Sequence, residues 1–380
     1  MKVSGDVIVR PCCSHVVVRS SSPGLWSRHI TALHRTSCPL ELTPRMTSTI
    51  PEISVVLPVW NAECTIERAV CSILNQTFPT FELIVIDDGS ADRTSEILAQ
   101  MSDNRLQVVQ TEHQGVAAAA NLGTRLARGP IIARMDADDC AHPDRLACQL
   151  SYLKKHELDV VGSRIQIQTP TGLLTDGMAR YERWINEDTV TPEQIQTLRF
   201  VEFPLVNPSI LARRDYFRLS FRDNNLPEDY DLMLRAAHQG MRFGKTPEVL
   251  LTWHDTPFRL TRTDSRYSVE SFMECRRFHF LNGPLCRVSM VDIWGAGPTG
   301  KLWLRWLKDR KITVRKLIDI SERKLGQTIH GVPVMAPEQL GGPDGTPMIV
   351  AVGAAGARPI ITKFVSELSY HIGADVWFVA

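Results

Sequence analysis

Three aspartates in four positions, Asp136-Ala-Asp-Asp139, are the residues of this sequence best suited to chemistry. Carboxylates this close repel one another unless they share a cation, and such oxygen ligands favour Mg²⁺ or Mn²⁺. An ion of this kind usually takes one or two carboxylates plus substrate phosphates, and it neutralises a phosphate leaving group. The alternative is a solvated acidic loop in which Asp139 caps a helix that begins near Pro143. The spacing alone leaves both interpretations open.

The acidic run follows an apolar segment that is typical of a buried parallel strand. Asn61 and the pair Asp87-Asp88 end two similar apolar segments. Strands alternate with helical patterns, which predicts an α/β fold with a mixed, mostly parallel sheet. Ligands of such sheets bind beyond the carboxyl ends of the strands, so these polar residues should meet at one edge. The predicted strands span residues 53–60, 81–87, 106–110 and 131–135, and the helices between them span 62–75, 91–101 and 115–128.

Several motifs along residues 51–260 occur in a characteristic order. They are Ser54-Val-Val-Leu-Pro-Val-Trp-Asn61, Ile86-Asp-Asp-Gly-Ser90, Gly115-Val-Ala-Ala-Ala-Ala-Asn121, Ala133-Arg-Met-Asp-Ala-Asp-Asp139, Pro143-Asp-Arg-Leu146, Gln149 and Pro227-Glu-Asp-Tyr-Asp-Leu-Met-Leu-Arg235. Together they strongly resemble the family 2 glycosyltransferases of the GT-A fold. The resemblance implies an inverting, metal-dependent transfer of a sugar from a nucleotide-diphospho-sugar, most commonly a UDP-sugar.

The resemblance also implies roles for matching positions. Asp88 would read the edge of the base, although it could instead be a turn carboxylate before Gly89. Asp136 would lie near the ribose and Asp138 would bind Mg²⁺ or Mn²⁺, with Asp139 behind them. The nucleotide-sugar site as a whole would comprise Pro58, Val59, Trp60, Glu63, Asp88, Asp136 and Ala137.

A transfer of this kind needs a carboxylate that takes a proton from the acceptor hydroxyl. The family likeness points to Asp229 in Glu228-Asp-Tyr-Asp231. Asp231 and Glu228 stay open as alternatives. Acidic residues are also favoured in the first turn of a helix for purely structural reasons, and a helix is predicted over residues 232–239.

One position departs from the family pattern, because Ala120 stands where many relatives have Arg before the Asn. Arg125 or Arg134 could supply the missing cation. His254 lies where relatives often place a basic residue near the diphosphate, and it could equally be structural. Three further arginines form either a flap over the donor or a solvated basic loop, namely Arg259, Arg262 and Arg266.

A glycine motif marks a second α/β unit near the end of the chain. Gly295, Gly297 and Gly300 follow a predicted strand and open a predicted helix, as in dinucleotide-binding motifs, and Asp319 ends the next strand. Amide groups there could hold a phosphate. The unit is similar to the small Rossmann-like domain ahead of some sugar acyltransferases, where it binds nucleotide-sugars. A structural or docking module is the alternative.

The bulk properties limit the function classes. The chain has 380 residues, 22% charged, with a net charge of +1, so no overall field favours nucleic acid. Nine cysteines without CxxC pairs indicate neither a zinc site nor a disulfide framework. We predict an extension over residues 1–50, poorly ordered or a transit-like leader. A GT-A domain over 51–265, a helical linker over 266–286 and a Rossmann-like domain over 287–380 would follow.

The expected function is sugar transfer to a glycan or lipid-linked acceptor in cell-surface polysaccharide synthesis. No apolar run approaches the roughly 20 residues of a membrane span, so we expect a cytoplasmic protein, in peripheral contact with the membrane if the acceptor is lipid-linked. Two alternatives are a nucleotide-sugar sensor and an oxidoreductase or epimerase centred on Gly295 to Gly300. The lack of a Tyr-x-x-x-Lys pair near that motif argues against a short-chain epimerase.

Overall fold

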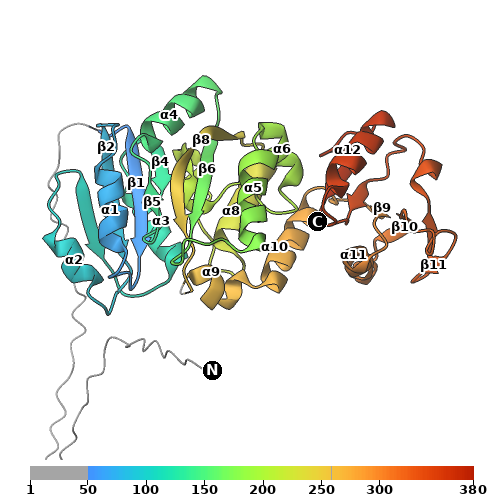
Figure 1. The fold of residues 1–380 in the computed structure, drawn as a ribbon, viewed down its shortest axis with the longest axis horizontal. Helices are drawn as coiled ribbons and strands as arrows, with labels where there is room; N and C mark the ends of the chain where they lie inside the picture. Colours follow the sequence, from blue (N-terminus) through green and yellow to red (C-terminus); the bar gives the residue numbers. More distant parts are fainter. Residues whose placement is uncertain (1–49, 258) are drawn as a thin grey trace, which may run out of the picture. The chain divides into compact units, whose positions relative to one another are not determined.

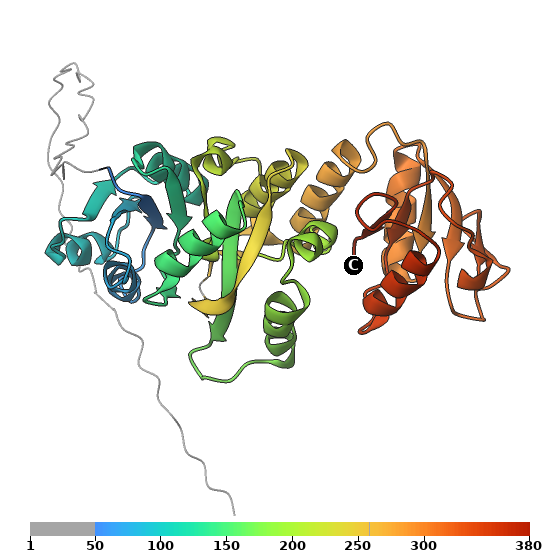
Figure 2. The same cartoon turned by 90° about the horizontal axis from the view of Figure 1, so that it is seen from above.

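The computed structural model describes residues 50–257 and 259–380. The predicted extension therefore lies, except for Ile50, outside the described residues. The rest of the chain builds two separate sheets, with helix α10 between them in both views (Figures 1 and 2).

The first sheet has eight strands in the order β3-β2-β1-β4-β7-β6-β8-β5. Strands β3, β2, β1 and β4 run parallel, β7 is antiparallel to both β4 and β6, and β6 pairs in parallel with β8. This confirms the predicted α/β class with a mixed sheet. The strands are β1 (Ile53–Val59), β2 (Phe81–Asp87), β3 (Leu106–Gln110), β4 (Ile131–Arg134), β5 (Cys140–Ala141), β6 (Val160–Gln168), β7 (Leu211–Arg213) and β8 (Phe243–His254).

Helices cover both faces of the central strands. Successive side chains of a strand point to opposite faces. Accordingly, Val55 and Leu57 of β1 share a core with α1, whereas Val56 shares a core with α3. The helices of this part are α1 (Ile66–Leu74), α2 (Thr94–Gln100), α3 (Val116–Leu126), α4 (Arg145–Lys155), α5 (Asp176–Arg183), the π-helix η1 (Trp184–Asp188), α6 (Pro192–Leu198), the 3-10 helix η2 (Asn207–Ser209), α7 (Arg214–Arg218), α8 (Glu228–His238), α9 (Leu260–Thr263), the 3-10 helix η3 (Ser265–Tyr267) and α10 (Val269–Asn282).

Two expectations for the middle of the chain need correction. The sequence pattern over residues 165–260 is less regular and predicts no strand there, yet this region holds the end of β6 and all of β8, and these two strands pair over nine positions. These strands carry polar side chains such as Gln166 and Lys245, so they lack the continuous apolar run that marks β1. Helix α8 also begins at Glu228, four residues before the predicted start, and its first turn holds three acidic residues.

The second sheet has six strands in the order β11-β12-β10-β9-β13-β14, all parallel except β11. Its strands are β9 (Met290–Trp294), β10 (Thr313–Ile318), β11 (Thr328–Ile329), β12 (Val332–Met335), β13 (Met348–Val350) and β14 (Val376–Phe378). Its helices are α11 (Pro298–Asp309), the 3-10 helix η4 (Pro337–Gln339) and α12 (Ala357–Glu367).

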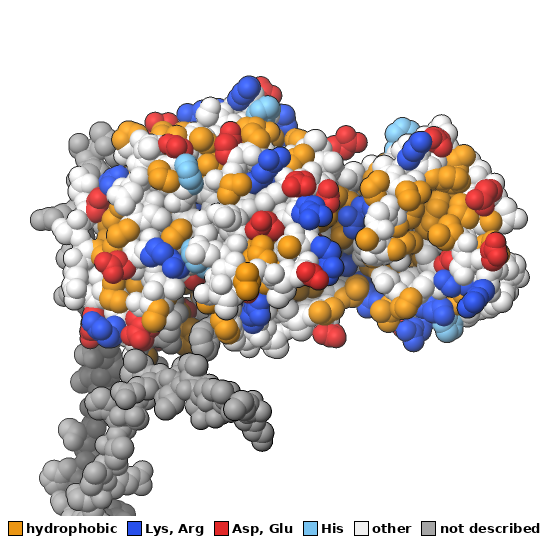
Figure 3. Space-filling view, in the orientation of Figure 1, with side chains coloured by type: hydrophobic (Ala, Val, Ile, Leu, Met, Phe, Trp, Pro, Cys, Tyr) orange, Lys and Arg blue, Asp and Glu red, His pale blue; other side chains and the backbone are white. Residues whose placement is uncertain are grey.

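Buried side chains of helix α10 pack against residues of both parts of the chain. Phe280 packs against Phe200 of the first part and against Trp303 and Trp377 of the second, with ring centroids 4.9, 5.4 and 6.2 Å apart. The predicted domain limits at residues 265 and 286 remain a proposal. On the face drawn in Figure 3, acidic and basic side chains are interspersed. Within residues 50–257 and 259–380, no helix is long and apolar enough to cross a membrane.

Candidate active site

The carboxyl ends of β1 and β2 form one side of the site, because Val59 pairs in register with Asp87. Asp88 follows directly and is buried. Its carboxylate accepts hydrogen bonds from the Gln114 and Gly115 amides, at 2.9 and 2.8 Å. Asp88 therefore holds the loop that precedes α3, so both oxygens of this predicted base reader already have partners.

Trp60 is the exposed side chain of the predicted nucleotide wall. Its neighbours Pro58 and Val59 are buried, whereas Trp60 is 49% exposed. The indole stacks on His113 with centroids 4.5 Å apart, and His113 Nδ1 lies 2.9 Å from Asp88 Oδ2. The prediction from sequence did not include His113. Its position two residues before the Gly115 motif is a signal that could have suggested it.

Glu63 links two loops at the same edge. Its carboxylate accepts a hydrogen bond from the Arg93 amide at 3.1 Å, and its own amide donates to Asp92 at 3.0 Å. Asn61 accepts similarly from the Ala91 amide at 2.8 Å. These contacts give Glu63 a structural task besides its predicted contact with the nucleotide.

The acidic run after β4 brings its three carboxylates together. Oxygen atoms of Asp136, Asp138 and Asp139 lie within 4.8 Å of one another. Asp139 is completely buried; its Oδ1 accepts from the His254 amide at 2.8 Å, and its Oδ2 has no hydrogen-bond partner among the described residues. A buried carboxylate oxygen without a partner is costly, and a hard cation would satisfy it. The donor set therefore fits Mg²⁺ or Mn²⁺.

Electrostatics support the same interpretation. Burial raises the pKa of Asp139 well above its ordinary value, and the charge of Asp138 raises it further. Burial also raises the pKa of Asp138, against the opposing charge of Arg259, whose Nε lies 3.9 Å from Asp138 Oδ2. Arg134 pairs with Asp136 at 2.9 Å. Arg68, which the sequence did not suggest, donates to the Asp138 carbonyl at 2.9 Å.

The motif that follows the acidic run, with Arg145 and Gln149, supports it through buried hydrogen bonds. Arg145 is buried and donates to the Arg134 carbonyl at 2.7 Å and to Gln149 at 3.0 Å, and Gln149 donates to the Ser209 carbonyl at 2.7 Å. The alternative in which Asp139 caps the next helix is wrong, because Asp144 occupies the N-cap position of α4.

Three carboxylates in the first turn of α8 have different surroundings. Asp231 is fully buried and is bound by Arg235 and His279, at 2.8 and 2.9 Å. Both oxygens of Glu228 accept from the Tyr267 hydroxyl at 2.7 Å. Asp229 is only partly buried and accepts from the amide of the next residue at 2.7 Å.

Asp229 also interacts electrostatically with the acidic run. Burial raises its pKa to about 6, and the charge of Asp136 contributes to that rise. Burial and the charge of Asp229 raise the pKa of Glu228 to about 7. By contrast, burial would raise the pKa of Asp231, but the hydrogen bonds from His279 and Arg235 outweigh it and lower that pKa.

The other predicted cations separate by position. Arg125 is exposed on α3, and Ala120 is buried. Of the predicted flap, Arg259 lies over the Trp253 ring at 4.2 Å and faces Asp138. Arg262 pairs instead with Asp255 and Arg266 with Asp264, at 2.5 and 3.5 Å. Burial lowers the pKa of His254, and its Nδ1 has no partner in the described part of the chain.

The predicted second nucleotide site lies on the other sheet, at the ends of β9 and β10. Gly295 has φ +114°, and a side chain on Gly300 would meet the Gly295 carbonyl at 1.7 Å, so the fold requires both glycines. Gly297 has open space around it. Asp319 accepts from the Ala296 and Ser321 amides and from Lys324, all within 2.9 Å.

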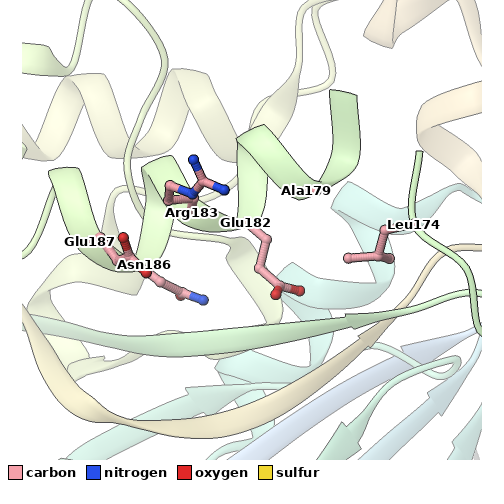
Figure 4. A pocket seen from close by; sticks show the side chains of 6 residues that line it. All are labelled: Leu174, Ala179, Glu182, Arg183, Asn186 and Glu187. Carbon is pink, nitrogen blue, oxygen red and sulfur yellow. The ribbon is translucent and has the colours of Figure 1, made fainter. Parts of the chain in front are cut away.

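A hollow of about 240 Å³ lies beside α5 and η1, and no residue of the acidic run lines it (Figure 4). Glu182 and Asn186 on this side bind backbone groups of β6, at Ile167 and Ile165. They satisfy the free edge of that strand. The hollow is lined by Leu174, Ala179, Glu182, Arg183, Asn186 and Glu187.

The sequence and the fold both match known proteins. The model of Glycosyl transferase family 2 matches residues 54–219. The putative glycosyltransferase EpsE of Bacillus subtilis strain 168 is 28% identical over 261 residues, covering 63% of this chain and 90% of the relative. The Escherichia coli UDP-Glc:alpha-D-GlcNAc-diphosphoundecaprenol beta-1,3-glucosyltransferase WfgD is 34% identical over 116 residues, covering 30% and 46%. For several relatives the chain thus spans about half of their length.

Among solved structures, the crystal structure of S. aureus TarS 1-349 in complex with UDP-GlcNAc has a TM-score of 0.49 and 21% identity, covering 61% of this chain and 67% of that chain. The ordered motifs, the mixed sheet and the family match agree with one another. The match of residues 54–219 to the family 2 glycosyltransferase model and the mixed first sheet therefore agree with the GT-A fold that the motifs predicted.

Proposed function

We propose that this protein moves a sugar from a nucleotide-diphospho-sugar, a UDP-sugar in the first instance, to a hydroxyl group of an acceptor with inversion. The bond from the acceptor oxygen to the anomeric carbon forms as the bond to the diphosphate breaks. Asp229 takes the hydroxyl proton, and the nucleoside diphosphate leaves with the electron pair. A single displacement of this kind inverts the anomeric carbon.

One observation carries the proposal. Of the three carboxylates in the first turn of α8, Asp229 is the one without a hydrogen bond to another described side chain, and the charge of Asp136 helps to raise its pKa. This contact in charge supports a base next to a donor site, because Asp136 follows β4 and lies beside Asp138 and Asp139. A raised pKa near the working pH suits general-base catalysis.

For the donor site we propose the residues that the family likeness implies. Asp138, with Asp139 beside it, would hold Mg²⁺ or Mn²⁺, which supplies charge neutralisation of the diphosphate when bound. Asp136 would lie near the ribose and Trp60 beside the base. Pro58, Val59, Glu63, Asp88 and Ala137 would complete the nucleotide-sugar pocket.

The acceptor is proposed to be a glycan or a lipid-linked sugar in cell-surface polysaccharide synthesis. The support is the name of the E. coli relative, which describes a diphosphoundecaprenol acceptor. A cytoplasmic protein in peripheral contact with the inner face of the membrane would suit such an acceptor.

Replacing the base separates binding from transfer. We expect Asp229→Asn to lower kcat by about 10²- to 10⁴-fold, since a positioned base contributes roughly that factor. Metal-dependent UDP binding should stay within twofold of the wild type, because Asp229 does not contact the donor. Asp215→Asn, on the exposed face of α7, is the matched control. Full transfer by Asp229→Asn would show that the base is another residue.

We also propose, as a second function, that the ends of β9 and β10 bind a nucleotide or nucleotide-sugar. The support is Gly297, which no packing contact requires to be glycine. Asp319 is committed to three donors, so its predicted ribose contact would have to displace one of them. The test is a thermal-shift screen of nucleotides on an Asp138→Ala background. A ligand-induced shift that Gly297→Val removes would support the site, and no shift with any nucleotide would exclude it.

A further inference from the structure

The turn that carries Asp229 is held from one side by the segment Tyr267–His279, which comprises the end of η3 and most of α10. The Tyr267 hydroxyl donates to Glu228 at 2.7 Å. Ser271 Oγ donates to the Asn225 carbonyl at 2.8 Å, just before the turn. His279 Nε2 lies 2.9 Å from Asp231 Oδ1. Bracing contacts thus fall on both sides of Asp229.

The contact between His279 and Asp231 belongs to a longer chain of bonds. Asp231 is fully buried, and its other oxygen accepts from Arg235 Nε at 2.8 Å. Arg235 also donates to the carbonyls of Leu219 and Ser220, both at 2.6 Å. A buried carboxylate needs partners of this kind. The chain therefore fixes α8 to α10 and to the end of α7 at once.

Helix α10 is in turn supported by the second sheet. Arg276 donates to the Val379 carbonyl at 3.0 Å and also to the Val201 carbonyl. Phe280 packs on Trp303 of α11 and on Trp377 of β14. Residues of α11 and of the last strand thus pack on α10 from the side of the second sheet.

Asp229 itself contributes little to its own orientation. Its hydrogen bond within the described chain goes to the next amide. A base must hold a near-attack position, and a displacement of about 1 Å can lower a rate by roughly 10²-fold. We propose that the segment Tyr267–His279, buttressed by the second sheet, positions the base of the transferase. Tyr267 and His279 are then positioning residues, and the C-terminal sheet is part of the catalytic apparatus. This rests on the proposed function.

The test compares His279→Leu and Tyr267→Phe with variants that make similar changes elsewhere. The controls are Glu274→Ala, at an exposed position of α10, and Tyr370→Phe, which removes a hydroxyl that donates to the Gly342 carbonyl in a loop between strands of the second sheet. We expect kcat to fall at least about tenfold in His279→Leu and about fivefold in Tyr267→Phe, with donor KM within twofold, as for lost positioning. His279→Gln keeps a donor of similar reach and should recover to within about threefold.

A second readout needs no substrate. Amide hydrogen exchange of the full chain should show faster exchange at residues 226–232 in His279→Leu, with β1 and β2 unchanged. If no donor is turned over by the wild type, the proposed function fails, and this readout still decides whether the turn is held as proposed. Unchanged exchange in that turn, unchanged kcat in both variants, or faster exchange throughout the first sheet would each overturn the proposal.

Discussion

Carboxylates of one type behave differently in this site because each has different neighbours. In the acidic run, Asp136 is paired with Arg134, Asp138 faces Arg259, and Asp139 keeps one buried oxygen without a partner in the described chain. In the first turn of α8, hydrogen bonds commit Glu228 and Asp231 to structure and leave Asp229 available. The roles follow from these partners rather than from residue type.

The pKa of the base predicts a pH dependence. We expect kcat to fall as the pH is lowered through about 6, because burial raises the pKa of Asp229 to about 6 and a protonated carboxyl cannot accept the proton. The measurement is kcat at saturating donor between pH 5 and pH 8. Glu228→Gln should keep a fall in this range. A rate that stays constant down to pH 5 would contradict this assignment.

At the residue scale, the sequence can indicate neighbours only where a local motif brings them together. The motifs placed Asp136, Asp138 and Asp139 together, as the structure does. They could not predict that the His254 amide binds Asp139 across 115 positions of the chain, or that His279 binds Asp231 across 48. Such partners depend on the tertiary fold, which local sequence motifs do not specify.

Secondary-structure elements were predictable where burial leaves a simple pattern. Strands β1 to β4 agree with their predicted ranges within one residue, because parallel central strands are continuous apolar runs. Strands β6 and β8 were missed, because side chains such as Gln166 and Lys245 interrupt the pattern. Lys245 is buried and donates to the Ile185 carbonyl, a contact that only the folded chain reveals.

The turn between β9 and α11 permits a stability prediction. We expect Gly300→Ala to lower the free energy of unfolding by about 1–3 kcal/mol or more, because the new methyl group would meet the Gly295 carbonyl at 1.7 Å. Gly297→Ala has open space and should cost less than about 1 kcal/mol, as expected at a helix N-cap. Urea unfolding of both variants is the measurement. Equal losses would contradict the packing role of Gly300.

At the scale of the molecule, the sequence predicted two α/β units and the structure contains two sheets. We predicted a helical linker over residues 266–286, and α10 lies in this range as a packed helix with hydrogen bonds to both sides. Its apolar residues do not mark this role, because Phe272 and Phe280 find aromatic partners far along the chain. Spacing along a single helix cannot show which partners it has.

The central claim is that the acidic run forms a metal-dependent donor site for a nucleotide-sugar. The most direct measurement incubates the protein with a panel of UDP-sugars and other nucleotide-sugars in Mn²⁺ or Mg²⁺ and quantifies the released nucleotide. We predict release from at least one donor, dependent on the ion and abolished by Asp138→Ala, with the exposed Asp215→Asn unaffected. Absence of release and of metal-dependent binding with every donor would contradict the claim.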